Sequence, residues 1–147
     1  RSLLAGEVMA VPDRVVFDAE PLIAHADDEP GSDVVEEYLD AVAVEDTAGF
    51  ASCVNLAEIR YTIARKYDRD TADEYLDWLT DLGIETVDVG DAWLEASEYV
   101  LQYNPALGDS FALATAEDVE ATLLVGGDDD YDEISDVPIT RFRDGSG

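Results

Sequence analysis

Short apolar runs alternate with amphipathic helical segments along the whole chain. Apolar runs such as residues 15–17 and 122–125 have the length of buried strands, and in the stretches between them apolar residues recur every three or four positions. Strands separated by helices run parallel, and a parallel sheet is covered by helices on both faces. The pattern therefore predicts one domain at residues 9–147, with the fold class α/β: a three-layer α/β/α sandwich around a central, mostly parallel sheet.

The boundaries of these elements follow from local signals. We expect strands at residues 15–17, 49–54, 84–89, 122–125 and 137–140, with helices between them. The helix that begins near residue 71 has the Thr-x-x-Glu spacing of a capping box, and the helix at 108–117 is apolar enough to be buried. Two tryptophans on helical stripes, Trp78 and Trp93, are expected in the core.

The chain is very acidic, with 36 acidic residues, 8 basic residues and a formal net charge of -28. Roughly a quarter of its residues are Leu, Ile, Val or Phe, which is above the range of disordered chains. The acid therefore coats a folded body, as expected for a protein from a halophilic organism. In molar salt the screening length falls to about 3 Å, so this net charge does not exclude RNA as a partner.

The sequence predicts a cytoplasmic protein without a membrane segment. Cys53 is the single cysteine, so no disulfide can form within the chain, and no apolar run is as long as a membrane span. Met9 followed by Ala-Val-Pro resembles a native start, so we interpret residues 1–8 as an added or upstream extension.

Several catalytic classes are disfavoured by residue counts. His25 is the single histidine and lies far from Cys53 in sequence, which argues against serine–histidine and cysteine–histidine catalysis and excludes thiolate zinc sites. Carboxylates remain, and they can either coat a surface or hold a hard cation. Four of them stand at strand ends or helix starts, where ligands bind in parallel sheets: Asp18, Glu58, Asp109 and Asp128.

Each of these carboxylates also has a purely structural explanation. Glu58 could close a capping box with Asn55, Asp109 could cap a helix, and Asp128 could belong to an acidic turn. Their joint placement favours a metal site, because ionised carboxylates that face one another repel unless a cation lies between them.

These motifs together resemble the PIN-domain family over residues 15–140. The segments that carry the resemblance are Val-Val-Phe-Asp18-Ala-Glu-Pro-Leu-Ile-Ala, Ser52-Cys-Val-Asn-Leu-Ala-Glu58-Ile, Leu107-Gly-Asp109-Ser-Phe-Ala-Leu-Ala, and Ala121-Thr-Leu-Leu-Val-Gly-Gly-Asp128-Asp-Asp130-Tyr131. The resemblance implies a ribonuclease in which Asp18, Glu58, Asp109 and Asp128 are catalytic and bind Mg²⁺ or Mn²⁺. It further implies a VapC-type toxin that hydrolyses RNA, forms a homodimer and has a small cognate antitoxin.

The chain departs from the family pattern at two places. Family members commonly carry a small hydroxyl residue after the first Asp and another two positions before the last, where this chain has Ala19-Glu20 and Gly126. Ser52 and Ser110 could partly substitute, and Asp130 could support the metal ligands. Because of these departures, a catalytically impaired PIN-like adaptor or partner-binding module is the alternative function.

Half of the basic side chains follow Glu58 closely: Arg60, Arg65, Lys66 and Arg69. They could contact RNA phosphates or the antitoxin. Equally, they could complement a helix C-terminus and pair with acidic residues on the surface.

Three other acidic-site classes fit the sequence poorly. A phosphoryl-accepting receiver domain needs a lysine after a late strand, whereas Lys66 lies within a helix. An EF-hand starting at Asp128 would have Glu133 at its glycine position and Ile139 at its glutamate position. A haloacid-dehalogenase-type phosphatase needs an Asp two residues after Asp18, where this chain has Glu20.

Overall fold

A computed structural model describes residues 10–144, and the extension expected at residues 1–8 lies outside them. The sheet has five parallel strands in the order β3-β2-β1-β4-β5. Their bounds are β1 (Arg14–Phe17), β2 (Ala48–Ser52), β3 (Glu85–Val87), β4 (Thr122–Val125) and β5 (Ile139–Arg141). The most apolar strands, β1 and β4, lie side by side at the centre, so that both of their faces are buried.

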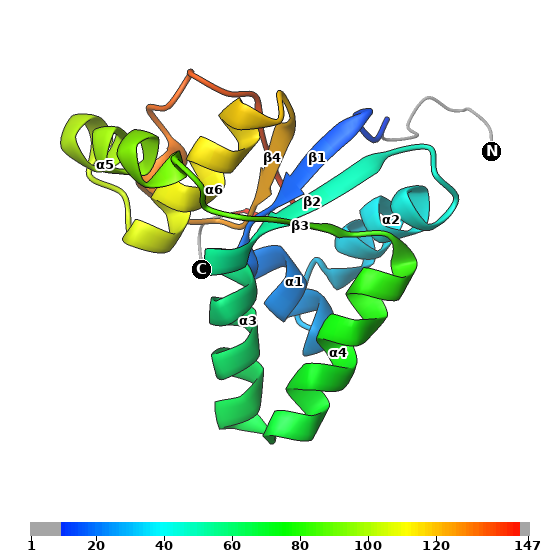
Figure 1. Ribbon diagram of the computed structural model, residues 1–147. Helices are drawn as coiled ribbons and strands as arrows, with labels where there is room; N and C mark the ends of the chain where they lie inside the picture. The colour runs from blue at the N-terminus through cyan, green and yellow to red at the C-terminus, as the bar shows by residue number, and fades with distance from the viewer. Residues whose placement is uncertain (1–9, 145–147) are drawn as a thin grey trace.

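Helices cover both faces of the sheet (Figure 1). The helices are α1 (Ala19–Ala26), α2 (Ser32–Ala43), α3 (Cys53–Lys66), α4 (Arg69–Leu82), α5 (Ala92–Tyr103) and α6 (Leu107–Asp118), with a short 3₁₀ turn η1 (Asp129–Tyr131). Residues Val15 and Phe17 of β1 pack in one core with α1 to α4, whereas Val16 packs in a second core with α5 and α6. This alternation follows from the two-residue period of a strand, and it confirms the predicted three-layer sandwich.

Some boundaries differ from the sequence expectation. The second strand ends at Ser52, and α3 already begins at Cys53 because the Ser52 hydroxyl accepts a hydrogen bond from the amide of Asn55 and caps the helix. Helix α4 is capped in the same way by Asp68, which accepts from the amide of Thr71, so the predicted capping box at Thr71 is wrong.

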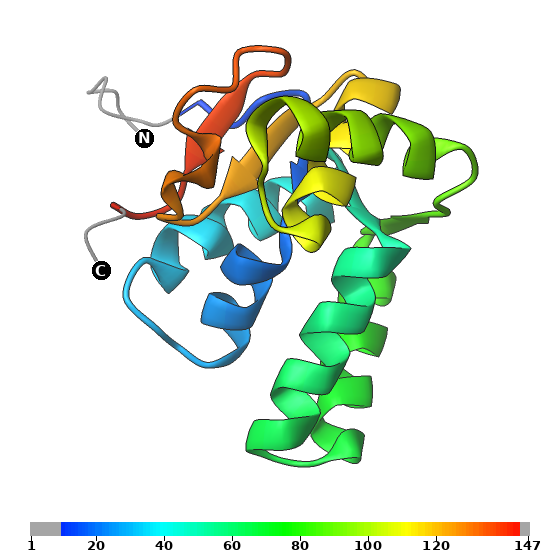
Figure 2. The same ribbon diagram turned by 90° about the vertical axis from the view of Figure 1, so that its left-hand side faces the viewer.

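The two tryptophans expected in the core are partly exposed. Trp78 is 41% exposed and stacks on His25, and Trp93 is 59% exposed at the start of α5. Helices α3 and α4 form a long antiparallel pair that extends beyond the sheet (Figure 2). Trp78 lies on α4 and also stacks on Tyr75 of the same helix, so its ring is covered only in part. Among residues 10–144, no helix is long and apolar enough to cross a membrane.

The two-sided burial of β4 gives a test of this packing. Leu124 is fully buried, so Leu124→Ala should lower the free energy of unfolding by about 2–5 kcal/mol through lost transfer energy and a residual cavity. Val44, which is 65% exposed, is the matched control, and Val44→Ala should change the free energy of unfolding by less than about 0.5 kcal/mol. Urea denaturation of both variants measures the difference, and equal effects would contradict this assignment of the core.

Candidate active site

The acidic side chains meet at one edge of the sheet because β1 and β4 are parallel neighbours. Asp18 follows β1 directly, and its amide donates to the carbonyl of Leu124 at 3.0 Å, which continues the pairing with β4. Asp128 lies three residues beyond the end of β4. Both carboxylates therefore leave the sheet at its carboxyl-terminal edge, where the second turn of α3 brings Glu58 and the first turn of α6 brings Asp109.

Asp18 is buried, with 4% of its surface exposed. It caps α1, and its Oδ1 accepts from the amide of Ala19 at 2.8 Å while its Oδ2 accepts from the hydroxyl of Tyr131 at 2.7 Å. Burial raises the pKa of Asp18 well above its ordinary value, and the charge of Asp109 raises it further, although the hydrogen bonds from Tyr131 and Ala19 oppose the rise. Without a cation, the site therefore favours the protonated form of Asp18.

Tyr131 provides a proton at the centre of the site. It is 3% exposed, and burial together with the charges of Asp18 and Asp109 raises its pKa far above the ordinary value. Its hydroxyl consequently stays protonated and remains a donor to the Asp18 carboxyl group.

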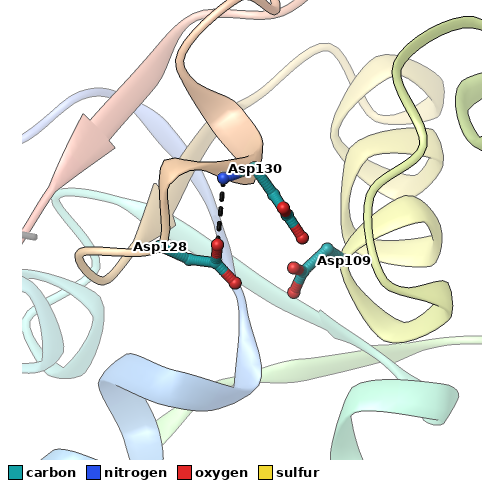
Figure 3. Close-up of side chains that lie close together, drawn as sticks. All are labelled: Asp109, Asp128 and Asp130. Carbon is teal, nitrogen blue, oxygen red and sulfur yellow. Dashed lines mark hydrogen bonds between the residues drawn. The ribbon is translucent and has the colours of Figure 1, made fainter.

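A second acidic group lies beside Asp18. Figure 3 shows the side chains of Asp109, Asp128 and Asp130 close together. Each offers an oxygen, and the three oxygens lie within 4.8 Å of one another. The amide of Asp130 donates to Asp128 at 2.9 Å, and Asp130 in turn accepts from the amide of Ala106 at 3.2 Å. These two bonds fix η1 against the start of α6, so the spacing of the three carboxylates is set by backbone as well as side chains.

Within this second group, the pKa of Asp109 is raised. Burial raises the pKa of Asp109 to about 6, and the charges of Asp128 and Asp130 act in the same direction, while a hydrogen bond from Tyr131 opposes them. Oxygen donors arranged in this way are suited to a hard divalent cation, whose charge would favour the ionised form of Asp109.

Glu58 is positioned by Asn55, one turn earlier on α3. The fully buried amide of Asn55 donates to Glu58 Oε1 at 2.9 Å and to the carbonyl of Gly108 at 3.2 Å, and it approaches Asp18 Oδ1 at 3.5 Å. The Ser52 hydroxyl donates to the Asn55 side-chain oxygen at 3.1 Å and so fixes which way the amide points. Asn55 thus bridges Asp18, Glu58 and α6.

A glycine is needed where Glu58 meets α6. A side-chain carbon at Gly108 would clash with the Glu58 carboxylate, lying 2.7 Å from its Cδ and Oε2. Glycine at this position therefore lets the carboxylate approach the helix backbone.

The two serines that could replace the family's hydroxyl groups make other contacts. Ser52 bonds to Asn55, as described above, and the Ser110 hydroxyl donates to the carbonyl of Leu107 at 2.6 Å within α6. The place of the missing side chain at Gly126 is filled by the carboxylate of Glu20, which a Cβ at residue 126 would overlap. Arg143 holds Glu20 there through a contact of 3.0 Å.

The four basic residues that follow Glu58 lie outside this group of carboxylates. They are Arg60, Arg65 and Lys66 on α3, and Arg69 at the start of α4. Arg60 pairs with Asp73 at 2.7 Å and Lys66 pairs with Asp27. Arg65 instead stacks on the ring of Tyr61, 4.9 Å from its centroid.

Three residues position the carboxylates in a way that was not predicted from the sequence: Asn55, Tyr131 and Gly108. Asn55 was interpreted only as half of a capping box with Glu58, although an Asn at that spacing also places an amide beside the carboxylate. The hydroxyl of Tyr131 sits in an acidic turn, and nothing in its neighbourhood along the chain indicates that it reaches back to Asp18.

The raised pKa of Asp109 makes a prediction for folding in metal-free buffer. The folded-state pKa of about 6 lies above the ordinary value of 3.8, so protonation of Asp109 favours the fold. This contribution is fully present below about pH 4 and is lost as the pH rises through 6. Asp109→Asn should therefore add about 1–2 kcal/mol to the free energy of unfolding above pH 7, discounted for partial exposure, and nothing below pH 4.

Urea denaturation across this pH range measures the effect. Asp129→Asn is the matched control, because Asp129 is an exposed neighbour in the same turn, and its effect should stay within about 0.5 kcal/mol at every pH. If Asp109→Asn raises the free energy of unfolding equally at every pH, the increase does not come from the ionisation of Asp109.

The fold is shared with several solved toxin–antitoxin structures. VapBC2 from Rickettsia felis bound to a DNA fragment from their promoter contains a chain with a TM-score of 0.71 and 15% identity, covering 87% of this chain and 98% of that chain. A toxin–antitoxin complex from Klebsiella pneumoniae gives a TM-score of 0.68 with 17% identity, covering 88% of this chain and 98% of that chain.

DNA-bound VapBC from Salmonella typhimurium is similar to the same extent, with a TM-score of 0.68, 10% identity, and coverage of 88% of this chain and 98% of that chain. No curated protein matches the sequence significantly. The sequence model of the PIN domain matches residues 15–137, which include β4, all of β1 but its first residue, and every carboxylate of the site. The chain belongs to the PIN domain family.

Proposed function

We propose that the protein is a metal-dependent endoribonuclease and the toxin of a toxin–antitoxin pair. PIN domains are generally nucleases. The observation that carries the proposal is the convergence of carboxylates from separate elements at one sheet edge: Asp18 after β1, Glu58 on α3, Asp109 on α6, and Asp128 with Asp130 after β4. Gathering these carboxylates does not by itself favour folding, because burial and neighbouring charges raise the pKa of Asp18 and of Asp109.

The donor set fits Mg²⁺ or Mn²⁺, since all its members are hard oxygen ligands. When bound, such an ion lowers the pKa of a coordinated water and neutralises charge that develops on a phosphodiester. Asp109 and Asp128 would hold the ion from α6 and from the turn after β4, and Asp18 and Glu58 would complete the acidic shell. Asp130 would hold the turn in place through its bond to Ala106.

The neutral residues of the site keep these carboxylates in place. Asn55 holds Glu58 toward α6, and Tyr131 donates to Asp18 whether or not the other carboxylates are ionised. Both are fully or almost fully buried, so their hydrogen bonds are protected from competing water.

The partner proposals rest on the structural neighbours and on the surface. Neighbouring structures contain VapBC and toxin–antitoxin complexes, which supports a cognate antitoxin for this chain. Helix α5 exposes Trp93, Leu94 and Leu101, with 59%, 54% and 78% of their surfaces exposed, and this apolar group supports the proposed homodimer. The acidic surface supports a halophilic origin, so molar KCl is the appropriate assay medium.

A catalytically impaired adaptor is the second candidate function. It is favoured by the serine contacts, because the hydroxyls of Ser52 and Ser110 bond to Asn55 and Leu107 instead of replacing the family's hydroxyls beside the carboxylates. The cleavage experiment below separates the two candidates.

Cleavage should require the acidic site and a divalent ion. In molar KCl the protein should cut total cellular RNA into discrete fragments with Mn²⁺ or Mg²⁺ and not with EDTA. Asp18→Asn and Asp109→Asn, purified identically, should lose at least about 100-fold in rate, because each removes a charged ligand. Asp129→Asn, exposed in the same turn, should retain wild-type activity. Metal-dependent cutting that survives in both site variants would point to a contaminating nuclease, and no cutting by any variant would favour the adaptor.

Gly108→Ala should reduce activity without unfolding the protein. The added carbon would displace the Glu58 carboxylate from α6, and we expect about a 10-fold or larger loss of kcat with an unchanged circular dichroism spectrum. Leu107→Ala, at a neighbouring side chain that is 64% exposed, is the control. Full activity in Gly108→Ala would mean that the position of Glu58 against α6 is unimportant.

Metal binding should be visible as stabilisation. At a Mn²⁺ concentration 100 times its Kd, the free energy of unfolding of the wild type should rise by about 2.7 kcal/mol. The free energy of unfolding of Asp109→Asn should rise much less at the same concentration, since this variant lacks one of the three clustered carboxylates. An equal response of both proteins would place the Mn²⁺ elsewhere on the acidic surface.

A further inference from the structure

One side of α3 connects the acidic site with an exposed aromatic and basic surface. Glu58, Tyr61 and Arg65 are spaced i, i+3 and i+7, so they lie on the same face of the helix. With a rise of 1.5 Å per residue, Tyr61 and Arg65 lie about 4.5 Å and about 10 Å along the axis from Glu58. Because α3 extends beyond the sheet, this face leads from the site along the α3–α4 pair (Figure 2).

Tyr61 and Arg65 form a stacked pair that is open to solvent. Tyr61 is 47% exposed, and the Arg65 guanidinium lies 4.9 Å from the centroid of its ring. They border a hollow of about 670 Å³. Its remaining lining comes from both helices and their connection: Arg60, Ala64, Tyr67, Asp68, Arg69 and Asp70.

Ion pairing separates the four basic residues of this region into two groups. Arg60 and Lys66 are bound to Asp73 and Asp27, so their charges are largely neutralised within the fold. Within residues 10–144, Arg65 and Arg69 form no ion pair, and both are exposed beside the hollow. Of these four residues, the two whose charge is not neutralised by an ion pair thus border the hollow beside Tyr61.

We propose that the face formed by Tyr61, Arg65 and Arg69 binds an unpaired RNA strand and guides it to the carboxylates; this inference rests on the proposed ribonuclease function. Charge complementarity selects a polyanion, because free cations are concentrated here on a chain of formal net charge -28. The aromatic ring selects a single strand, since only an unpaired base offers a free face for stacking on Tyr61. Arg65 and Arg69 would contact the phosphates that flank that base.

The inference can be tested by binding, separately from cleavage. A short fluorescein-labelled RNA without self-complementarity is titrated with the Asp109→Asn protein in EDTA and molar KCl, and its fluorescence anisotropy is recorded. The same RNA annealed to its complement is titrated in parallel as the double-stranded comparison. We expect the single strand to bind at least about 10-fold more tightly than the duplex.

Substitutions in the same Asp109→Asn background locate the contact. Tyr61→Ala should weaken single-strand binding about 5- to 100-fold, the range for loss of one stacked base, and Tyr61→Phe should restore it to within about twofold. Arg65→Gln should weaken it and lower its salt dependence. Arg14→Gln, at an exposed arginine of β1 outside this hollow, is the matched control and should bind normally.

The outcomes distinguish this inference from the proposed function. Normal binding by Tyr61→Ala would overturn the inference even if the wild type cleaves RNA. Tight single-strand binding that depends on Tyr61 would support it even if the wild type cleaves nothing, in which case the ribonuclease proposal alone fails. Sedimentation of the Tyr61→Ala protein completes the test, because loss of self-association with unchanged RNA binding would make this face a contact between two copies and overturn the inference.

Discussion

Repulsion between carboxylates at the carboxyl-terminal edge of the sheet is the constraint on which the site depends. Burial pushes Asp18 and Asp109 toward their protonated forms, the charge of Asp109 adds to the effect on Asp18, and the charges of Asp128 and Asp130 add to the effect on Asp109. A fold selected for stability alone would not bury Asp18 and Asp109 together, because taking their charges out of water removes part of the hydrophobic gain from the two cores. A divalent cation between the oxygens would make the arrangement favourable.

Buried neutral side chains hold these carboxylates in place despite their repulsion. Asn55 donates both to Glu58 and to the backbone of α6, and Tyr131 donates to Asp18 from the turn after β4. Each of these side chains connects two elements that are distant in sequence, so they fix the separation of the carboxylates as well as satisfying them. Gly108 contributes by leaving out a side chain where Glu58 needs room. Rigid placement of this kind is what a metal centre requires of its surroundings.

The acidic surface imposes a different requirement on any nucleic-acid substrate. With 36 acidic side chains, the chain can attract a polyanion only where cations are free, and the ion pairs of Arg60 and Lys66 leave Arg65 and Arg69 on the α3–α4 pair. The stacking of Arg65 on Tyr61 combines charge with an aromatic face at that place. High salt would mute long-range repulsion while leaving such short contacts effective.

The sequence by itself determined the class of fold and the set of acidic candidates, whereas the tertiary structure decided how they are held. Apolar periodicity is local, so the alternation of strands and helices, and hence the parallel sheet with acids at its strand ends, could be predicted from the chain alone. The roles of Tyr131 and Asn55 could not, because they depend on contacts across 113 and 53 residues, to Asp18 and to Gly108. The exposure of Trp78 and the separation of Arg65 from its ion-paired neighbours were also beyond prediction, since both depend on how far α3 and α4 project past the sheet and on which acids lie opposite them.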